Sequence, residues 1–95
     1  MELEWDEVKR LRTLEERGLD FADIMRFEFE TALTQPDVRK DYGEKRFNST
    51  GYLDGALCNL CWTVRSKRFR IISRRKCNER ERKKYERAAS SADAR

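Results

Sequence analysis

The densest group of chemically useful side chains lies in the last third of the chain. It consists of four arginines and a serine, at Arg65, Arg70, Ser73, Arg74 and Arg75. A planar guanidinium group pairs its N–H groups with phosphate oxygens. Cleavage of RNA needs little more when the ribose 2′-OH is the nucleophile, because the protein then aligns the reacting groups and stabilises charge on the phosphate. The same residues also fit a face that only binds, or arginines paired with Glu44, Glu79 or Glu81.

Several other kinds of chemistry are excluded. The chain has no histidine, so Ser-His-Asp, Cys-His and paired-histidine mechanisms are excluded. Cys58 and Cys61 match a CxxC pattern, but residues three apart on a strand point to opposite faces, and no second pair completes a zinc site. Cys58 fits a buried structural role instead. Proton transfer is left to carboxylates, lysine, arginine, tyrosine and cysteine, and we expect no metal and no cofactor.

The charge distribution favours a polyanionic partner. Residues 1–30 carry ten acidic and five basic side chains, whereas residues 64–87 carry twelve basic and three acidic ones. A concentrated basic zone attracts nucleic acids. The three cysteines form no disulfide-like framework, and neither an apolar leader nor an 18-residue apolar run is present. We therefore expect a cytoplasmic protein without a membrane span.

The first elements that must position these residues are two helices. Residues 5–17 place Trp5, Val8, Leu11 and Leu14 at helical spacing, which predicts an apolar stripe. Gly18 suits a left-handed C-terminal cap, and Asp20 suits the cap of a shorter second helix that includes Phe21. Phe27 and Phe29 alternate, which indicates a change to a strand near them. Gln35-Pro36-Asp37 predicts a loop that runs to Gly43.

The second half of the chain reads as a sheet followed by a helix. Strands are predicted over residues 45–52, 56–65 and 69–75, with Asp54-Gly55 and Ser66-Lys67 as tight turns. Asn78 is expected to cap a polar final helix that ends near residue 87. The fold class is therefore α+β: two N-terminal helices, a small antiparallel sheet of three to four strands and a C-terminal helix. Residues 1–87 form a single domain, and residues 88–95 are expected to be a flexible tail.

Four stretches of the chain form a pattern that is specific when all occur in this order. They are Glu4-Trp5-Asp6-Glu7 with Lys9, Gly18 and Phe21; Asp37, Arg39, Tyr42-Gly43-Glu44 and Arg46; Gly51, Gly55, Leu57, Thr63 and Arg65; and Arg70-Ile71-Ile72-Ser73 with Arg75, Glu81-Arg82 and Tyr85. Together they resemble the BrnT toxins of type II toxin–antitoxin modules. The resemblance implies a RelE-like fold and a metal-independent endoribonuclease that slows translation. It also implies a ribbon-helix-helix antitoxin, similar to BrnA, through which the complex binds its promoter DNA.

The chain departs from the family pattern near the end of the first helix. The family usually has Asn and then Lys-His-Gly there, whereas this chain has Thr13 and then Glu16-Arg17-Gly18. The usual histidine is therefore replaced by Arg17. If that histidine serves catalysis in relatives, the resemblance implies that activity or base preference is altered or lost in this chain. Arg74 also stands where a small residue is common, which would strengthen phosphate binding.

Our site hypothesis is that Arg65, Arg70 and Arg75 converge on the scissile phosphate, with Ser73 in a positioning role. Glu44 is either a general base or the salt-bridge partner of Arg39 or Arg46, and the salt bridge is favoured. Substrate contacts are expected from Lys9, Arg46 and Arg74. Tyr42 either stacks on a base as a further substrate contact or anchors its loop. Trp5, Phe21 and Trp62 are expected in the core. The nuclease hypothesis depends on this convergence of the arginines. Arginine side chains that point to opposite sides of the sheet, or that pair with internal carboxylates, would contradict it whatever the family resemblance.

Two other functions compete with the nuclease. The first is a non-catalytic nucleic-acid or protein-binding domain that keeps the toxin fold, which the missing histidine supports. The second, a standalone DNA-binding regulator, lacks a basic recognition helix with an apolar face. For the toxin, an acidic and partly apolar antitoxin segment is expected to block the basic face. The polar last helix and the two N-terminal helices are the expected docking surfaces.

Overall fold

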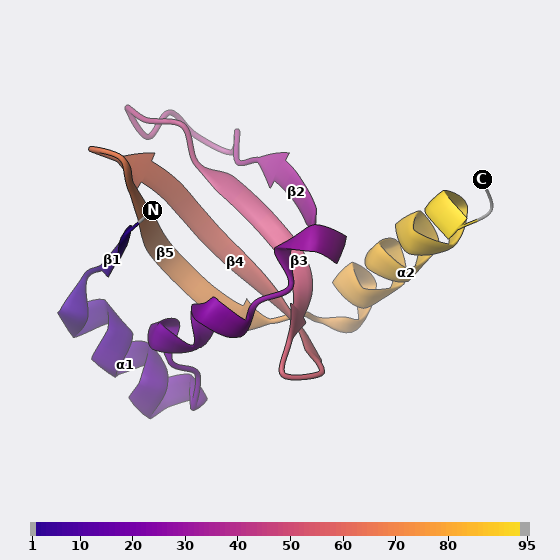
Figure 1. Ribbon diagram of the computed structural model, residues 1–95, viewed down its shortest axis with the longest axis horizontal. Coiled ribbons are helices and arrows are strands. Elements are labelled where there is room, and N and C mark those ends of the chain that lie inside the picture. Colours follow the sequence, from indigo (N-terminus) through magenta and orange to yellow (C-terminus); the bar gives the residue numbers. More distant parts are fainter. Residues whose placement is uncertain (1, 94–95) are drawn as a thin grey trace.

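A five-stranded sheet organises the computed structural model, which describes residues 2–93 (Figure 1). The strands lie in the order β1-β5-β4-β3-β2. Along the chain the elements are β1 (Glu2–Trp5), α1 (Glu7–Arg17), the 3₁₀ helices η1 (Phe21–Arg26) and η2 (Phe29–Thr31), β2 (Leu33–Pro36), β3 (Phe47–Leu53), β4 (Ala56–Arg65), β5 (Arg68–Lys76) and α2 (Glu79–Asp93). The α+β class is therefore confirmed, but the number and kind of elements differ from the expected set.

The central antiparallel hairpins agree with the sequence-based prediction. The turn between β3 and β4 has positive φ at Asp54 (53°) and Gly55 (80°), and the turn between β4 and β5 has positive φ at Ser66 (50°) and Lys67 (62°). Two consecutive left-handed residues match the twist of the flanking strands. β4 has the predicted limits, residues 56–65, and β5 is one residue longer at each end than predicted.

The first strand was not predicted from the sequence. Residues 2–5 pair in parallel with β5, with Leu3 opposite Phe69 and Trp5 opposite Ile71. Trp5 is therefore the end of a strand and not the start of the helix, so an all-antiparallel sheet of three to four strands is wrong. Asp6 begins α1 instead, because its carboxylate accepts the Lys9 backbone N–H at 3.1 Å.

The second N-terminal helix is a 3₁₀ helix and not an α-helix. Asp20 caps it as expected, by accepting the Ala22 N–H at 3.0 Å. The strand expected near Phe27 is reduced to one isolated bridge between Phe27 and Leu53, and η2 follows it. The segment expected to be a loop at Gln35-Pro36 is the end of β2, an edge strand where the missing N–H of proline is tolerated.

The core lies between η1 and one face of the sheet, which we call the core face. Phe21 and Ile24 of η1 pack with Leu60 and Ile71 from the two central strands. Phe21 is fully buried, as predicted, and its contacts hold η1 against the sheet. The Trp62 ring stacks between two phenylalanines, at centroid distances of 4.8 Å and 4.7 Å from Phe47 and Phe69.

Helix α1 turns its apolar stripe outward. Val8, Leu11 and Leu14 are 67%, 50% and 38% exposed, whereas Thr13 is buried. Gly18 ends the helix as predicted, in a left-handed conformation with its N–H bonded to the Leu14 carbonyl. The helix is therefore held by its polar side, and the stripe does not contribute to the core.

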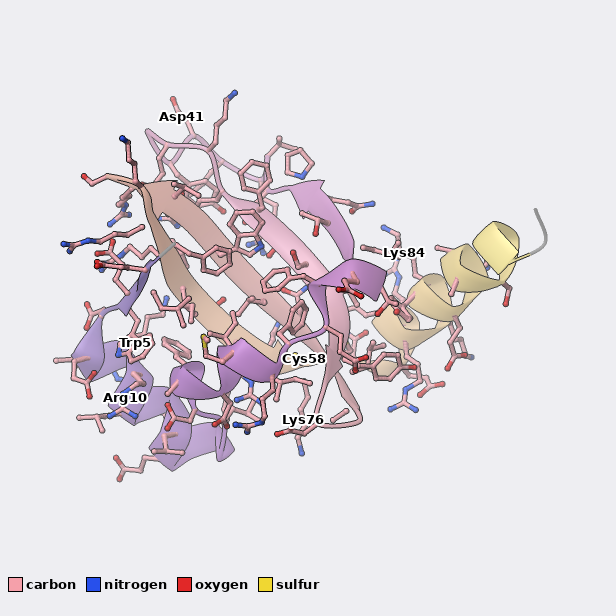
Figure 2. All side chains as sticks on the ribbon, in the orientation of Figure 1. Trp5, Arg10, Asp41, Cys58, Lys76 and Lys84 are labelled. Atoms are coloured by element: carbon pink, nitrogen blue, oxygen red, sulfur yellow. The ribbon has the colours of Figure 1, made fainter. Side chains whose placement is uncertain are left out.

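The second face of the sheet, here called the open face, carries mostly polar side chains. In the register of β4 and β5, Asn59 lies opposite Arg75 and Cys61 lies opposite Ser73, while the neighbouring Leu60–Arg74 pair belongs to the core face. Asp41, in the loop between β2 and β3, and Lys76, at the end of β5, lie at opposite ends of the sheet (Figure 2). The loop and the start of α2 therefore border opposite parts of the open face.

Helix α2 projects away from the sheet (Figure 1). Asn78 caps it as predicted, with its side chain accepting the Glu81 N–H at 2.8 Å. The helix continues through residues 88–93, past the expected end at residue 87, and residues 94–95 lie outside the described part; the domain division stays a prediction. Among residues 2–93, no helix is long and apolar enough to cross a membrane.

Candidate functional site

Two adjoining hollows on the open face form the candidate site, which we call the open-face groove. The first, of about 350 Å³, lies where the sheet meets α2 and is lined by Leu33, Gln35, Arg39, Asn48, Thr50, Asn59, Ser73, Arg75, Glu81, Lys84 and Tyr85. The second, of about 440 Å³, lies between the sheet, α1 and the β2–β3 loop and is lined by Lys9, Asp37, Arg39, Lys40, Tyr42, Arg46, Cys61, Ile72 and Ser73. Arg39 and Ser73 line both hollows, so the groove is continuous.

Arg75 lies in the groove in a bidentate ion pair with Glu81. Both nitrogen–oxygen distances are 2.6 Å. The Glu81 carboxylate also accepts the backbone N–H of Asn78 at 3.0 Å, which completes a capping box at the start of α2. The hydrogen bonds from Arg75, together with the one from Asn78, lower the pKa of Glu81 to about 2. Glu81 is therefore ionised at neutral pH, but its low pKa and its engagement by Arg75 make it a weak base.

Lys9 reaches the groove from the first half of α1. Partial burial lowers the pKa of its ammonium group. Among the described residues, no carboxylate lies within ion-pair distance of the Lys9 ammonium nitrogen, although Lys9 lines the same hollow as Ser73. The Lys9 ammonium group is thus a partly desolvated cation that can act as a proton donor.

The β2–β3 loop borders the groove and is held by a buried carboxylate. The Asp37 side chain is 1% exposed and forms two hydrogen bonds with the Arg39 guanidinium, at 2.9 Å and 2.7 Å. The Tyr42 hydroxyl donates to the same carboxylate at 3.1 Å. These donors, with Arg39 first, hold the pKa of Asp37 far below its usual range. The Arg39 side chain is nevertheless 76% exposed, so its outer edge remains accessible.

Arg46 and Tyr42 lie together in the second hollow. The Arg46 guanidinium carbon lies 4.2 Å from the centroid of the Tyr42 ring, which is cation–π geometry. The stack and the hydrogen bond to Asp37 fix the Tyr42 side chain within the loop. Tyr42 therefore anchors the loop, the alternative that the sequence left open beside stacking on a base.

Glu44 is engaged in ion pairs. It accepts two hydrogen bonds from Arg65, at 2.6 Å and 2.7 Å, and one from Arg46 at 2.9 Å. Arg65 and then Arg46 lower the pKa of Glu44 to about 2. The structure thus favours the salt-bridge interpretation of Glu44 over the general base, with Arg46 as one of its two expected partners and Arg65 in place of Arg39.

The expected convergence of Arg65, Arg70 and Arg75 is not found. Arg70 is five residues from Arg75 along β5, a separation of roughly 15 Å on a strand, and it lies 3.4 Å from Glu4 of β1. Arg65 is the last residue of β4 and pairs with Arg68. It therefore lies still further from Arg75 along the sheet than the Thr63–Arg70 pair does. The arginine side chains are thus spread along the strands and paired with three different carboxylates, which contradicts the nuclease site predicted from these three arginines. The two-residue periodicity of a strand predicts the face of a side chain but not its position along the strand.

Arg74 is not a groove residue. Its side chain lies on the core face and is 8% exposed, where it donates to the Asp20 backbone carbonyl at 2.5 Å and lies 3.3 Å from Asp23. The expected contact between Arg74 and substrate therefore has no support in this geometry. Arg74 instead ties β5 to the start of η1.

Five charged groove residues were not among the predicted site residues: Asp37, Arg39, Lys40, Glu81 and Lys84. Glu81 follows Asn78 by three residues, which is the capping-box spacing and the one local signal for its position. Arg39 and Lys84 come from a loop and from an almost entirely polar helix. No periodic pattern placed either of them on the open face.

The groove carries an excess of positive charge. Six cationic side chains and two carboxylates line it: Lys9, Arg39, Lys40, Arg46, Arg75 and Lys84 against Asp37 and Glu81. Within the residues that the structure describes, no group of three or more His, Cys, Asp or Glu side chains is arranged to hold a metal ion. A polyanion is therefore the ligand that this surface suits best.

Comparison with known families decides the class of this chain. Residues 5–81 match the family described as ribonuclease toxin, BrnT, of type II toxin–antitoxin system. The chain belongs to the BrnT family. The match extends from the end of β1 to Glu81 and covers every cationic groove residue except Lys84. The comparison with curated proteins gives no match.

Membership of the BrnT family supplies the coarse function. A BrnT protein is the ribonuclease toxin of a type II system, which implies RNA as the substrate and a cognate antitoxin as the partner. Arg17, at the position of the usual histidine, donates to the Arg74 backbone carbonyl at 3.1 Å. Arg17 is thus tied to β5, and the cation that lines the groove from α1 is Lys9.

Proposed function

We propose that this chain is a metal-independent endoribonuclease that cleaves RNA through the ribose 2′-OH in the open-face groove. The observation that carries the proposal is the excess of cations in the groove, with Lys9 free of a carboxylate partner beside Ser73. Cleavage of messenger RNA in the cytoplasm would inhibit translation. A ribbon-helix-helix antitoxin would neutralise the toxin and carry the complex to promoter DNA.

The arginines of the groove hold the phosphodiester. Arg39 and Arg75 lie on the walls of the first hollow, with Ser73 between the two hollows. Their guanidinium groups face the non-bridging oxygens, whose negative charge grows as the 2′ oxygen attacks phosphorus. Donors fixed in this way stabilise the transition state more than the bound substrate. The Ser73 hydroxyl donates one further hydrogen bond to the same oxygens.

Lys9 is the proton donor in this mechanism. The 2′ oxygen forms a bond to phosphorus, the bond from phosphorus to the 5′ oxygen breaks, and the Lys9 ammonium gives its proton to that leaving oxygen. The 2′-OH proton passes to solvent water, since the lowered pKa values of the groove carboxylates make them weak bases and arginines engage them. A partly desolvated ammonium group gives up its proton more readily than an exposed one. The products are a 2′,3′-cyclic phosphate and a 5′-hydroxyl.

The test is cleavage of a mixed-sequence RNA by purified protein in excess EDTA, with analysis of the new ends. We expect cleavage to persist in EDTA and to leave cyclic phosphate and 5′-hydroxyl ends. RNA in which every 2′-OH is methylated is the matched control, because the nucleophile is blocked while the phosphates remain. Cleavage that requires a divalent metal, or that proceeds on the methylated RNA, would contradict the mechanism.

The antitoxin is proposed to cover the groove with an acidic and partly apolar segment. Complementary charge supports this, because carboxylates of such a segment would pair with Lys9, Arg39 and Lys84. We expect the neighbouring gene product to form a stable complex and to protect RNA from cleavage. A complex in which RNA is still cleaved at the free toxin's rate would place the antitoxin elsewhere.

A non-catalytic binding domain is the second candidate function. The absence of histidine favours it, as do the lowered pKa values of Glu44 and Glu81, which make both carboxylates weak bases. This candidate predicts equal affinity for natural and 2′-O-methyl RNA, with a steep salt dependence and no cleavage of either. The EDTA experiment described above separates the two functions.

A further inference from the structure

The Arg75–Glu81 pair has the geometry of a bound oxyanion. Two nitrogens of one guanidinium contact two oxygens of one carboxylate at 2.6 Å each, as an arginine would grip a phosphate. The pair lies in the hollow that Arg39 and Lys84 also line. Among the described residues that line this hollow, Glu81 is therefore the one carboxylate, and the other charged side chains are three cations.

The helix that carries Glu81 is held to the sheet by few buried contacts. Among residues 79–90, Tyr85 is the buried side chain. Its hydroxyl donates to the Thr31 carbonyl at 2.9 Å, and its ring meets Tyr52 edge-on at 5.6 Å. The rest of α2 projects beyond the sheet (Figure 1). A shift of the first turn of α2 would therefore cost little buried surface.

We propose that Glu81 occupies the position of an RNA phosphate on Arg75, so that RNA engages Arg75 only when the first turn of α2 carries Glu81 away. This inference rests on the proposed function, because it assigns a phosphate to Arg75. The free protein is then partly autoinhibited, because RNA binding has to replace the internal Arg75–Glu81 ion pair. The affinity of the groove for RNA is then set in part by how firmly α2 is docked.

Glu81→Gln is the deciding variant. Glutamine at this position keeps the capping box with Asn78, because its amide oxygen still accepts the Asn78 N–H, but it removes the charge that neutralises Arg75. Glu79→Gln is the matched control: it removes the same charge from the same helical turn, at an exposed residue. The probe is a mixed-sequence 2′-O-methyl RNA oligonucleotide, which keeps the phosphates and resists cleavage through the 2′-OH.

We expect Glu81→Gln to bind this probe about two- to fivefold more tightly than Glu79→Gln, the fold-change that corresponds to one exposed ion pair. The plot of log affinity against log salt should steepen by about 0.7 relative to the control, the value for one added phosphate contact on a single strand. Combining Glu81→Gln with Arg75→Ala should abolish both gains. Tyr85→Phe, which removes only the bond to Thr31, should also tighten binding by loosening α2.

Equal affinity and equal salt slope for the Glu81→Gln and Glu79→Gln variants would overturn the inference. A gain that persists without Arg75 would overturn it too, because the gain would then be a general charge effect. Circular dichroism and urea unfolding of each variant establish that it is folded, and Tyr85→Phe leaves Glu81 unchanged if Glu81→Gln fails to fold. Binding of the probe needs no catalysis. If the parent protein fails to cleave natural RNA, this result contradicts the proposed nuclease but does not test this inference.

Discussion

Two bidentate arginine–carboxylate pairs stand at different positions along the same face of the sheet, and they differ in what surrounds them. Arg65–Glu44 lies where β4 ends beside the β2–β3 loop, and Arg75–Glu81 lies where β5 meets α2. Their nitrogen–oxygen distances are nearly equal, from 2.6 Å to 2.7 Å. Geometry of the pair alone therefore does not tell a structural arginine from a functional one.

The balance of charge around each pair does distinguish them. Glu44 is shared by Arg65 and Arg46, and the neighbouring Arg70 and Arg68 face Glu4 and Glu2, so acids offset the bases at that position. Around Arg75–Glu81 the other charged side chains of the hollow are the cations Arg39 and Lys84, with Lys9 in the adjoining hollow. An arginine contributes to anion binding when its surroundings hold more positive charge than its own carboxylate cancels.

The largest expected effect on this comparison comes from Lys9, which has no carboxylate partner among the described residues. Replacing Lys9 with alanine should lower single-turnover RNA cleavage by about 10²- to 10⁴-fold, the usual contribution of a general acid. Lys9→Arg keeps the charge but holds its proton too firmly, so it should bind 2′-O-methyl RNA like the parent and cleave slowly. The parent rate should also fall as pH rises through the lowered pKa of Lys9. Cleavage by Lys9→Arg at the parent rate would contradict the role.

The next effect compares the two pairs directly. Arg75→Ala should reduce cleavage by about 10²- to 10³-fold, as the loss of one transition-state donor does. Arg65→Ala is the matched variant and removes an equally well-formed ion pair, but it should change cleavage by less than about threefold because that pair lies outside the groove. Rate constants at saturating RNA measure the difference. Equal losses for both variants would mean that the whole basic face, and not the groove, carries the activity.

The sequence predicted the central hairpins because their signals are local. Asp54-Gly55 and Ser66-Lys67 define turns, and the alternation along residues 56–65 defines the two faces of β4. It also placed Ser73 and Arg75 together with Lys9, Arg46 and Tyr42 among the site residues, although their meeting in one groove depends on tertiary contacts. Signals of this kind fix an element and the direction of its side chains.

The remaining features depend on the folded context. β1 is four residues long and exists through its parallel pairing with β5, a partner more than sixty residues away in the chain. The stripe of Val8, Leu11 and Leu14 has helical spacing, yet spacing does not say which side of a helix meets the sheet. Arg74 and Arg75 are adjacent on β5 and therefore point to opposite faces. Their pairing with Leu60 and Asn59 of β4 decides that Arg74 faces the core and Arg75 the groove.

A smaller effect is expected on stability at the loop that borders the groove. Asp37→Asn should lower the free energy of unfolding by about 1.5–3 kcal/mol, because it weakens hydrogen bonds between a buried carboxylate and its donors Arg39 and Tyr42. Asp41→Asn, on an exposed residue of the same loop, is the control and should stay within about 0.5 kcal/mol of the parent. Urea unfolding at neutral pH measures both. Similar midpoints for the two variants would mean that the loop does not depend on the Asp37 cluster.

The smallest effect tests whether the two ion pairs contribute equally to stability, through their pH dependence. Arginine partners lower the pKa values of Glu44 and Glu81 from 4.5 to about 2. A carboxyl group whose pKa is lowered on folding stabilises the fold at pH values above its pKa in the unfolded state. This contribution is lost as pH falls from about 4.5 towards 2. The urea midpoint of each glutamine variant should therefore fall less than that of the parent over this pH range. Glu44→Gln and Glu81→Gln should differ from the parent by similar amounts, because the pKa values of the two carboxylates are lowered equally. A parent whose urea midpoint falls no more than that of either variant would show that the ion pairs do not stabilise the fold.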